Sequence, residues 1–96
     1  MENTPLHAAL AGAQDAAVVR ALLAGGASAT LAVAHGVTPL HLAASRGNRT
    51  LCELLLAHGA DARAVMHDGK EARAIAAERR HAEVSEWLTS RTTSHA

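Results

Sequence analysis

Apolar residues recur along this chain at helical spacing, in short segments separated by glycines. Between positions 49 and 58, Leu51, Leu54 and Leu55 fall at i, i+3 and i+4, which gives a helix there one continuous apolar stripe. Gly59 follows directly, and a glycine in that place is suited to ending a helix. The pattern therefore predicts an amphipathic helix over about 49–58.

A shorter helix is predicted just before this one. Thr38 is a good N-cap, Pro39 suits the first helical position because its missing N–H would have no partner there, and Gly47 can end the helix after 40–45. The two helices would form an antiparallel pair. The next stretch, 60–69, is too short and too rich in turn-forming residues for another helix, so we expect an extended loop or hairpin there.

This helix pair is one unit of an internal repeat. Thr-Pro-Leu-His at 4–7 recurs at 38–41, and segments 23–27 and 56–60 share Leu-Ala and Gly-Ala at equivalent places. A third unit is degenerate, because Glu-Ala-Arg-Ala at 71–74 replaces the tetrad. Its later residues Val84, Trp87 and Leu88 keep the helical spacing.

In these motifs the chain resembles the ankyrin repeat, from Thr4 to about Leu88. The resemblance implies an all-α solenoid, in which helix–loop–helix units are joined by extended, hairpin-like loops. We expect one domain over 1–96, with repeat 1 at about 2–35, repeat 2 at 36–68, a capping repeat at 69–91 and a tail at 92–96. The third unit would be a terminal cap, because Glu78, Arg79, Arg80, Glu83 and Glu86 offer it a polar outer face.

Composition and charge exclude several function classes. The chain is 49% hydrophobic but 1% aromatic, so its core must pack small side chains. Nine basic and nine acidic residues give no net charge, which argues against nucleic acid or an anionic membrane as a partner. One cysteine cannot form an internal disulfide, and no secretory signal or membrane span is evident. We therefore expect a cytoplasmic protein.

The charges are unevenly distributed along the chain. Three charged residues lie in 1–35, six in 36–68 and nine in 69–96. Repeat 1 is the least polar unit, and its large apolar residues cannot all face repeat 2: Leu6, Leu10, Val18, Val19 and Leu22. Its outer face would then be covered by a second copy or a partner, giving a possible homodimer through repeat 1. The alternative is that its alanines leave a tolerable exposed surface.

The resemblance implies a non-catalytic module that binds a partner protein through its loop tips and the concave face lined by the first helices. Ankyrin loop tips commonly carry Asn and Asp, whereas this chain places Val33 and Met66 at Asp-like positions. Val65, His35 and His67 flank them. We expect an exposed apolar ladder edged by imidazoles to contact the partner. The alternative is that these loop residues fold back on the next repeat.

The ends of the first helices are a second candidate contact region. Ser45, Arg46, Arg79 and Arg80 would lie beside the loop tips. Glu78 and Glu83 flank the second basic run, so a solvated capping face is the simpler explanation of Arg79 and Arg80.

Seven histidines raise the question of a metal site. The resemblance implies that His7 and His41, in the tetrads, form structural hydrogen bonds within and between repeats. His35 and His67 would share adjacent loop tips, but two imidazoles without a further ligand at metal-binding spacing are weak evidence for metal binding or a pH-responsive sensor. We expect no metal and no cofactor.

No motif indicates catalysis. His41 and Ser45 share a helical face, yet no acid is placed to orient the imidazole and no nucleophile elbow or phosphate-binding loop is present. Cys52 is most simply a small buried residue. The sequence therefore predicts a protein-binding module, with self-association through repeat 1 as the alternative function.

Overall fold

A computed structural model of the chain describes residues 5–12, 16–30, 32 and 34–93. Within these residues the structure is helical and contains no named strand. The elements are α1 (Pro5–Ala11), α2 (Ala16–Ala24), the 3-10 turn η1 (Ala34–Gly36), α3 (Pro39–Ser45), α4 (Arg49–Ala57), α5 (Ala72–Glu78) and α6 (Ala82–Thr93). The all-α prediction is confirmed.

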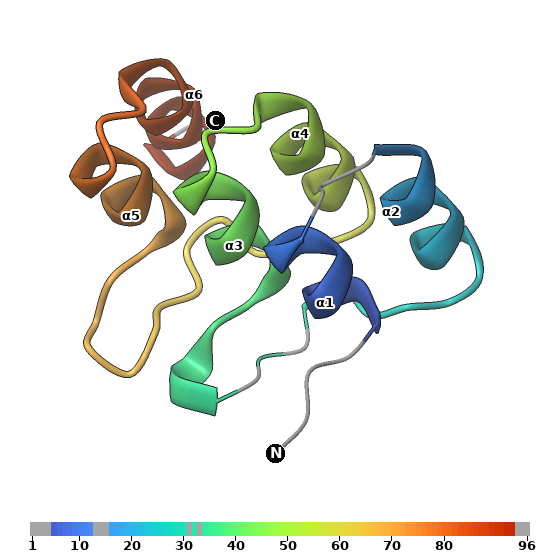
Figure 1. Ribbon diagram of the computed structural model, residues 1–96. Helices are drawn as coiled ribbons and strands as arrows, with labels where there is room; N and C mark the ends of the chain where they lie inside the picture. Colours follow the sequence, from blue (N-terminus) through green and yellow to red (C-terminus); the bar gives the residue numbers. More distant parts are fainter. Residues whose placement is uncertain (1–4, 13–15, 31, 33, 94–96) are drawn as a thin grey trace.

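The helices form three antiparallel pairs stacked side by side (Figure 1). Within the pairs, α1 contacts α2, α3 contacts α4 and α5 contacts α6. Between pairs, α1 packs on α3 and α3 on α5, so the first helices make one continuous layer. The connecting segments project from the same edge of this layer (Figure 1). The solenoid predicted from the repeat is therefore the observed architecture.

Repeat 2 begins and ends its helices with local signals. The hydroxyl oxygen of Thr38 accepts a hydrogen bond from the backbone N–H of His41 at 3.4 Å, and Pro39 opens α3. Asn48 caps α4 in the same way, through a 3.1 Å bond from the N–H of Leu51. Gly47 follows α3 at φ 68°, a left-handed conformation that glycine adopts without strain. These caps fix the predicted helix boundaries.

The core runs through the stack between the helix pairs. Equivalent positions of successive repeats are buried, as with Val19 of repeat 1 and Cys52 of repeat 2. Most of the buried apolar set is leucine or alanine: Leu6, Leu10, Leu23, Ala29, Leu40, Ala43, Ala44, Leu51, Leu55, Ala72, Ala76 and Leu88. Small side chains allow the helices to approach closely, as the composition predicted.

One connecting loop is a short hairpin. Val65 and Glu71 form an isolated antiparallel bridge, and the backbone N–H of Met66 donates to the carbonyl of Lys70 at 2.9 Å. The turn closes where the N–H of Gly69 donates to the carbonyl of Met66 at 2.8 Å. A bridge rather than a strand forms because the segment is too short to extend the pairing. The predicted hairpin-like loop is confirmed here.

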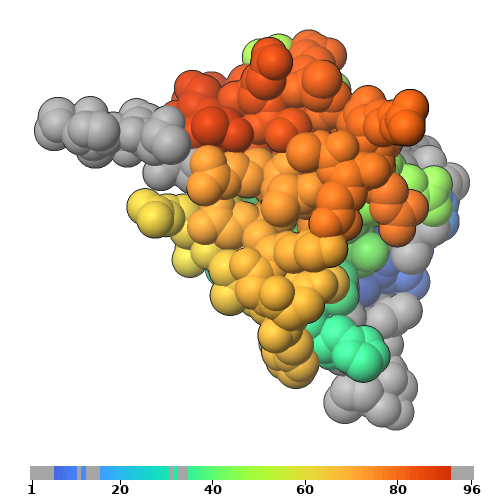
Figure 2. All heavy atoms as spheres, turned by 90° about the vertical axis from the view of Figure 1, so that its left-hand side faces the viewer, coloured from blue at the N-terminus to red at the C-terminus, as the bar shows by residue number. Residues whose placement is uncertain are grey.

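The C-terminal end of the stack is polar, as predicted. Helices α5 and α6 cover this end (Figure 2), and its five charged residues Glu78, Arg79, Arg80, Glu83 and Glu86 are exposed. The degenerate tetrad has a structural consequence, because Glu71 occupies the N-cap of α5 without a capping side-chain hydrogen bond.

The large apolar residues of repeat 1 divide between core and surface. Leu6, Leu10 and Val19 are fully buried, whereas Val18 is 47% exposed and Leu22 lies between these extremes. The prediction that they cannot all face the interior is therefore confirmed by Val18. Among the described residues, no helix combines the length and the hydropathy needed to cross a membrane.

Candidate partner-binding site

A groove of about 190 Å³ lies where α3, α5 and the hairpin loop meet, on the face formed by the first helices. It is lined by Val37, His41, Leu42, Ser45, Met66, Ile75 and Arg79. Four of these residues are aliphatic or thioether side chains, so the groove offers an apolar floor. A partner's apolar side chain would lose water contact there, with polar groups near its edge.

The floor of the groove repeats with the period of the fold. Leu42 and Ile75 occupy the same position of α3 and α5 in successive repeats, and both are half-buried. Stacking therefore places them side by side. We did not predict Val37, Leu42 or Ile75 as site residues, although the constant offset between repeats was a signal that could have identified the Leu42–Ile75 pair.

The polar side chains of Ser45 and His41 in the groove already form hydrogen bonds within the protein. The hydroxyl of Ser45 donates to the carbonyl of Leu42 at 2.8 Å, so its oxygen is left as an acceptor. Nε2 of His41 contacts the carbonyl of Lys70 at 3.0 Å. Burial lowers the pKa of His41, although the carbonyls of Lys70 and Ala64 and the charge of Asp68 oppose that shift. Both ring nitrogens are engaged within the fold, because Nδ1 accepts from the backbone N–H of Thr38, so the imidazole is a structural element.

Histidines of both tetrads bond to the following loop. His7 contacts the carbonyl of Val37 through Nε2 at 3.2 Å, as His41 does that of Lys70. Both rings are buried. The structural role that the resemblance implied for these two histidines is confirmed.

A basic rim adjoins the groove. Arg46 and Arg79 form this rim; they occupy equivalent positions of successive repeats, after α3 and α5, and both are exposed. Arg79 and Arg80 are exposed, as the predicted solvated capping face requires, but Glu78 and Glu83 do not pair with them. Glu78 instead pairs with Lys70, and Glu83 pairs with Arg49 at 3.3 Å.

These pairings leave positive charge beside the groove. Among the described residues, no carboxylate forms an ion pair with Arg79 or Arg80. Hydrogen bonding from guanidinium to carboxylate is charge-assisted and geometrically specific. The rim is therefore complementary to acidic side chains.

The loop tips form a second cluster. The backbone N–H of His67 donates to the carbonyl of His35 at 2.9 Å, and their rings meet edge to face with centroids 6.5 Å apart. Gly36 must be small here, because a Cβ atom would lie 2.9 Å from the His67 ring. The tips of repeats 1 and 2 are thus in direct contact.

The apolar ladder is only partly described. Val65 is 51% exposed, as predicted, whereas Met66 is half-buried against the groove. Val33 lies outside the described residues. Within the described part of the chain, no group of three or more potential metal ligands gathers at the two histidines or elsewhere.

The predicted contact residues therefore fall into separate groups. Ser45, Met66 and Arg79 line one groove, and Arg46 directly follows Ser45 at the end of α3. His35, Val65 and His67 lie at the loop tips. Arg80 lies apart from the groove, on a separate surface hollow beside Ser85 and Glu86. This separation was not visible from the sequence, because it depends on where α5 ends.

Comparison with known families agrees with this architecture. The family model described as "Ankyrin repeats (3 copies)" matches residues 6–95. The chain belongs to the ankyrin-repeat family. This ankyrin-repeat chain thus has the fold that its two Thr-Pro-Leu-His tetrads indicated.

One curated protein similar to this ankyrin-repeat chain is the RelA-associated inhibitor of Mus musculus. It is 44% identical over 57 residues, which are 59% of this chain but 7% of that protein. The chain therefore spans a small part of the relative's length. The printed name describes an inhibitor associated with another protein.

Proposed function

We propose that this ankyrin-repeat chain is a non-catalytic module that binds a partner protein through its concave groove and loop tips. The observation that carries the proposal is the groove itself, where an apolar floor lies beside Arg79. Membership of a family of interaction repeats and the similarity to an inhibitor named for its association with another protein support the same function class.

The proposed binding mode follows from the two kinds of surface. An apolar side chain of the partner would enter between Leu42, Met66 and Ile75, and an acidic side chain beside it would reach Arg79 or Arg46. The loop residues His35, Val65 and His67 would extend the contact. We expect modest affinity, because binding hot spots favour Trp, Tyr and Arg and the lone tryptophan lies outside the groove.

The test is affinity capture from the native cell, with the wild-type chain compared with a Met66→Asp/Arg79→Glu variant. Arg20→Glu is the matched charge reversal, because Arg20 is exposed on α2, away from the groove. The proposal predicts a protein that is recovered with wild type and Arg20→Glu but lost with the double variant. Equal recovery by all three folded chains contradicts it.

Met66→Asp has a second use. If it unfolds the domain, Met66 is a core residue and the loop-tip contact loses its basis; Arg79→Glu alone then tests the rim. Circular dichroism and urea unfolding of each variant distinguish the two outcomes.

Self-association through repeat 1 is the second candidate function. The exposed Val18 on α2 favours it, as does the low charge of this end of the stack. Native mass measured over a concentration series tests it, with Val18→Asp as the variant. A chain that stays monomeric at high concentration would remove this candidate.

The location that suits this module is the cytoplasm. Cys52, the one cysteine, is buried and free, so the fold holds without a disulfide and is compatible with a reducing compartment.

A further inference from the structure

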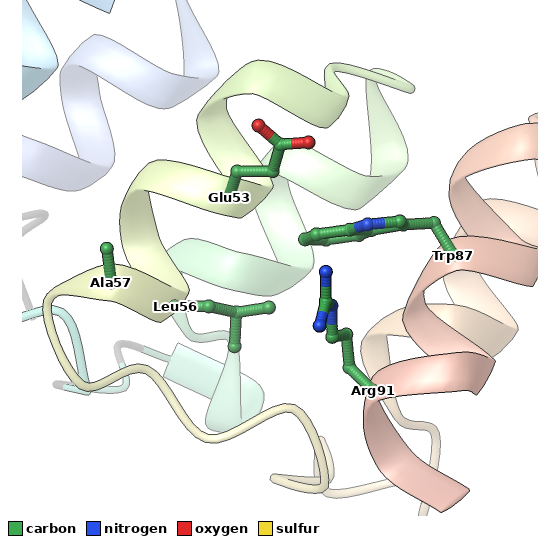
Figure 3. Close-up of a pocket in the computed structure, with 5 residues that line it drawn as sticks. All are labelled: Glu53, Leu56, Ala57, Trp87 and Arg91. Carbon is green, nitrogen blue, oxygen red and sulfur yellow. The ribbon is translucent and has the colours of Figure 1, made fainter. Parts of the chain in front are cut away.

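The second helices of repeats 2 and 3 meet through side chains. Arg49 of α4 pairs with Glu83 of α6 at 3.3 Å. A cleft of about 540 Å³ opens between the two helices (Figure 3), and none of the groove residues lines it. Glu53, Leu56 and Ala57 of α4 line it, together with Trp87 and Arg91 of α6.

Trp87 is the only tryptophan of a chain without Phe or Tyr, and it lines this cleft while part of it packs against the core. It is half-buried, and its ring projects from α6 toward α4 (Figure 3). Leu56 and Ala57 extend the apolar surface on the opposite wall. An open site with an indole and a leucine in it is suited to burying an apolar side chain.

Two guanidinium groups contact the indole. Arg91 lies 4.8 Å and Arg49 lies 5.4 Å from the ring centroid. Arg49 is also the partner of two carboxylates, Glu53 at 2.8 Å and Glu83 at 3.3 Å. Arg49 and Glu53 therefore compensate each other's charge.

Arg91 differs from Arg49 in this respect. Among the described residues no carboxylate pairs with it, and its exposed side chain lines the cleft beneath the Trp87 ring (Figure 3). Because Glu53 is held by Arg49, Arg91 is the uncompensated charge of the cleft. A carboxylate is the complementary ligand group, since it can accept two hydrogen bonds from one guanidinium.

We propose that this cleft is a second binding site, which takes a peptide segment of a partner protein carrying an aliphatic side chain next to Asp or Glu. The aliphatic group packs on Leu56, Ala57 and the Trp87 ring, and the carboxylate pairs with Arg91. The site uses α4 and α6 and none of the groove residues, so it does not depend on the function proposed above.

Because Trp87 is the only tryptophan, its fluorescence reports on binding in the cleft. We would titrate the chain with acetylated and amidated hexapeptides that place Leu, Ile, Met or Val beside Asp or Glu, and with the same peptides carrying Asn or Gln. We expect a saturable change in Trp87 emission, with the best acidic peptide binding roughly tenfold more tightly than its amide counterpart, about the effect of one charge-assisted contact. The preference should weaken with salt.

Two variants assign the effect to the cleft. Arg91→Gln should remove the preference for the acidic peptides, whereas the matched Arg20→Gln variant, on the exposed surface of α2 and outside both the cleft and the groove, should keep it. Leu56→Ala should weaken the acidic and amide peptides alike, because it removes apolar contact. Urea unfolding of each variant shows that it is folded.

Three results would overturn the proposal. The first is no saturable emission change with any acidic peptide up to about 5 mM, a concentration that detects the weakest specific sites. The second is a preference that persists in Arg91→Gln, which would make the cation–π contact of Arg91 purely structural. The third is a preference lost equally in Arg20→Gln, which would show that the overall charge of the chain, and not contact with Arg91, causes it.

Discussion

The Nε2 atom of His41 lies 3.0 Å from the carbonyl oxygen of Lys70, so a side chain of repeat 2 is bonded to the loop that enters the capping repeat. On the other side of the ring, Nδ1 accepts from the backbone N–H of Thr38 at 3.2 Å. A backbone N–H can only donate, which assigns the proton of the neutral ring to Nε2. The imidazole therefore connects the start of α3 to the next repeat.

Replacing this imidazole should destabilise the fold. We expect His41→Ala to lower the free energy of unfolding by about 1–3 kcal/mol, because the buried N–H of Thr38 loses its acceptor and the carbonyl of Lys70 loses one of its two donors. Urea unfolding measures the change. His58→Ala is the control, since His58 is exposed and its substitution should stay within about 0.5 kcal/mol of wild type. Equal effects of the two substitutions would contradict the proposed role.

The same residue makes stability depend on pH. Burial lowers the pKa of His41 below its ordinary value of 6.5, so the unfolded chain binds this proton more readily than the folded chain. Stability contributed by His41 is therefore complete above about pH 6.5 and decreases as the pH falls, until the lowered pKa is reached. Unfolding at several pH values with wild type and His41→Gln measures it. A pH dependence unchanged in the variant would show that other groups cause it.

Two glycines after helices offer a matched comparison. Gly47 and Gly59 both have left-handed φ angles, 68° and 98°. A Cβ atom on Gly59 would meet no other atom within 4 Å, whereas one on Gly47 would overlap the imidazole of His81. Gly59→Ala should cost about 1–2 kcal/mol from backbone strain alone, and Gly47→Ala should cost more. The two melting curves decide this, and a larger loss in Gly59→Ala would refute it.

The degenerate tetrad suggests a stabilising change. Glu71 begins α5 without capping it, and its Oε1 is buried without a hydrogen bond although Arg73 Nε lies 3.0 Å away. Glu71→Thr should stabilise the chain by about 0.5–1 kcal/mol, because threonine can cap α5 as Thr38 caps α3. Denaturant unfolding tests the sign. A loss of stability would mean that the Glu71–Arg73 pair outweighs the cap.

The free cysteine should report on opening of the stack. Burial raises the pKa of the Cys52 thiol to about 12, so the native chain holds almost no thiolate at neutral pH. We expect alkylation by iodoacetamide at pH 8 to be slow in the native chain and to become fast in urea. A native rate equal to that of the unfolded chain would show that α4 opens easily. Leu55→Ala, which weakens the same helix, should increase the native rate.

The sequence predicted the helix pairs because their signals are local. Thr38, Pro39 and Gly47 fix the limits of α3 by capping, fixed φ and a left-handed turn, and none of these needs a distant contact. The constant offset between repeats then predicted the stacking, since equal units bury equal faces. Even the buried state of Cys52 followed from its equivalence to Val19.

The candidate sites were less accessible to sequence reasoning. Ser45, Met66 and Arg79 were predicted as contact residues, but the groove that joins them needs Val37 and Ile75 from different repeats. The pairings of Glu78 with Lys70 and of Glu83 with Arg49, rather than with Arg79 and Arg80, were not predicted. Ion pairs between repeats depend on helix orientation, which no local pattern encodes.

The sequence by itself determined the repeat, the caps and the polar end of the stack, because each depends on neighbours a few residues away or on a fixed period. Only the tertiary structure decided that a cleft opens between α4 and α6 and that Trp87 and Arg91 line it. The spacing of two helices is set by the summed packing of all the side chains between them, and that sum exists only once the chain has folded.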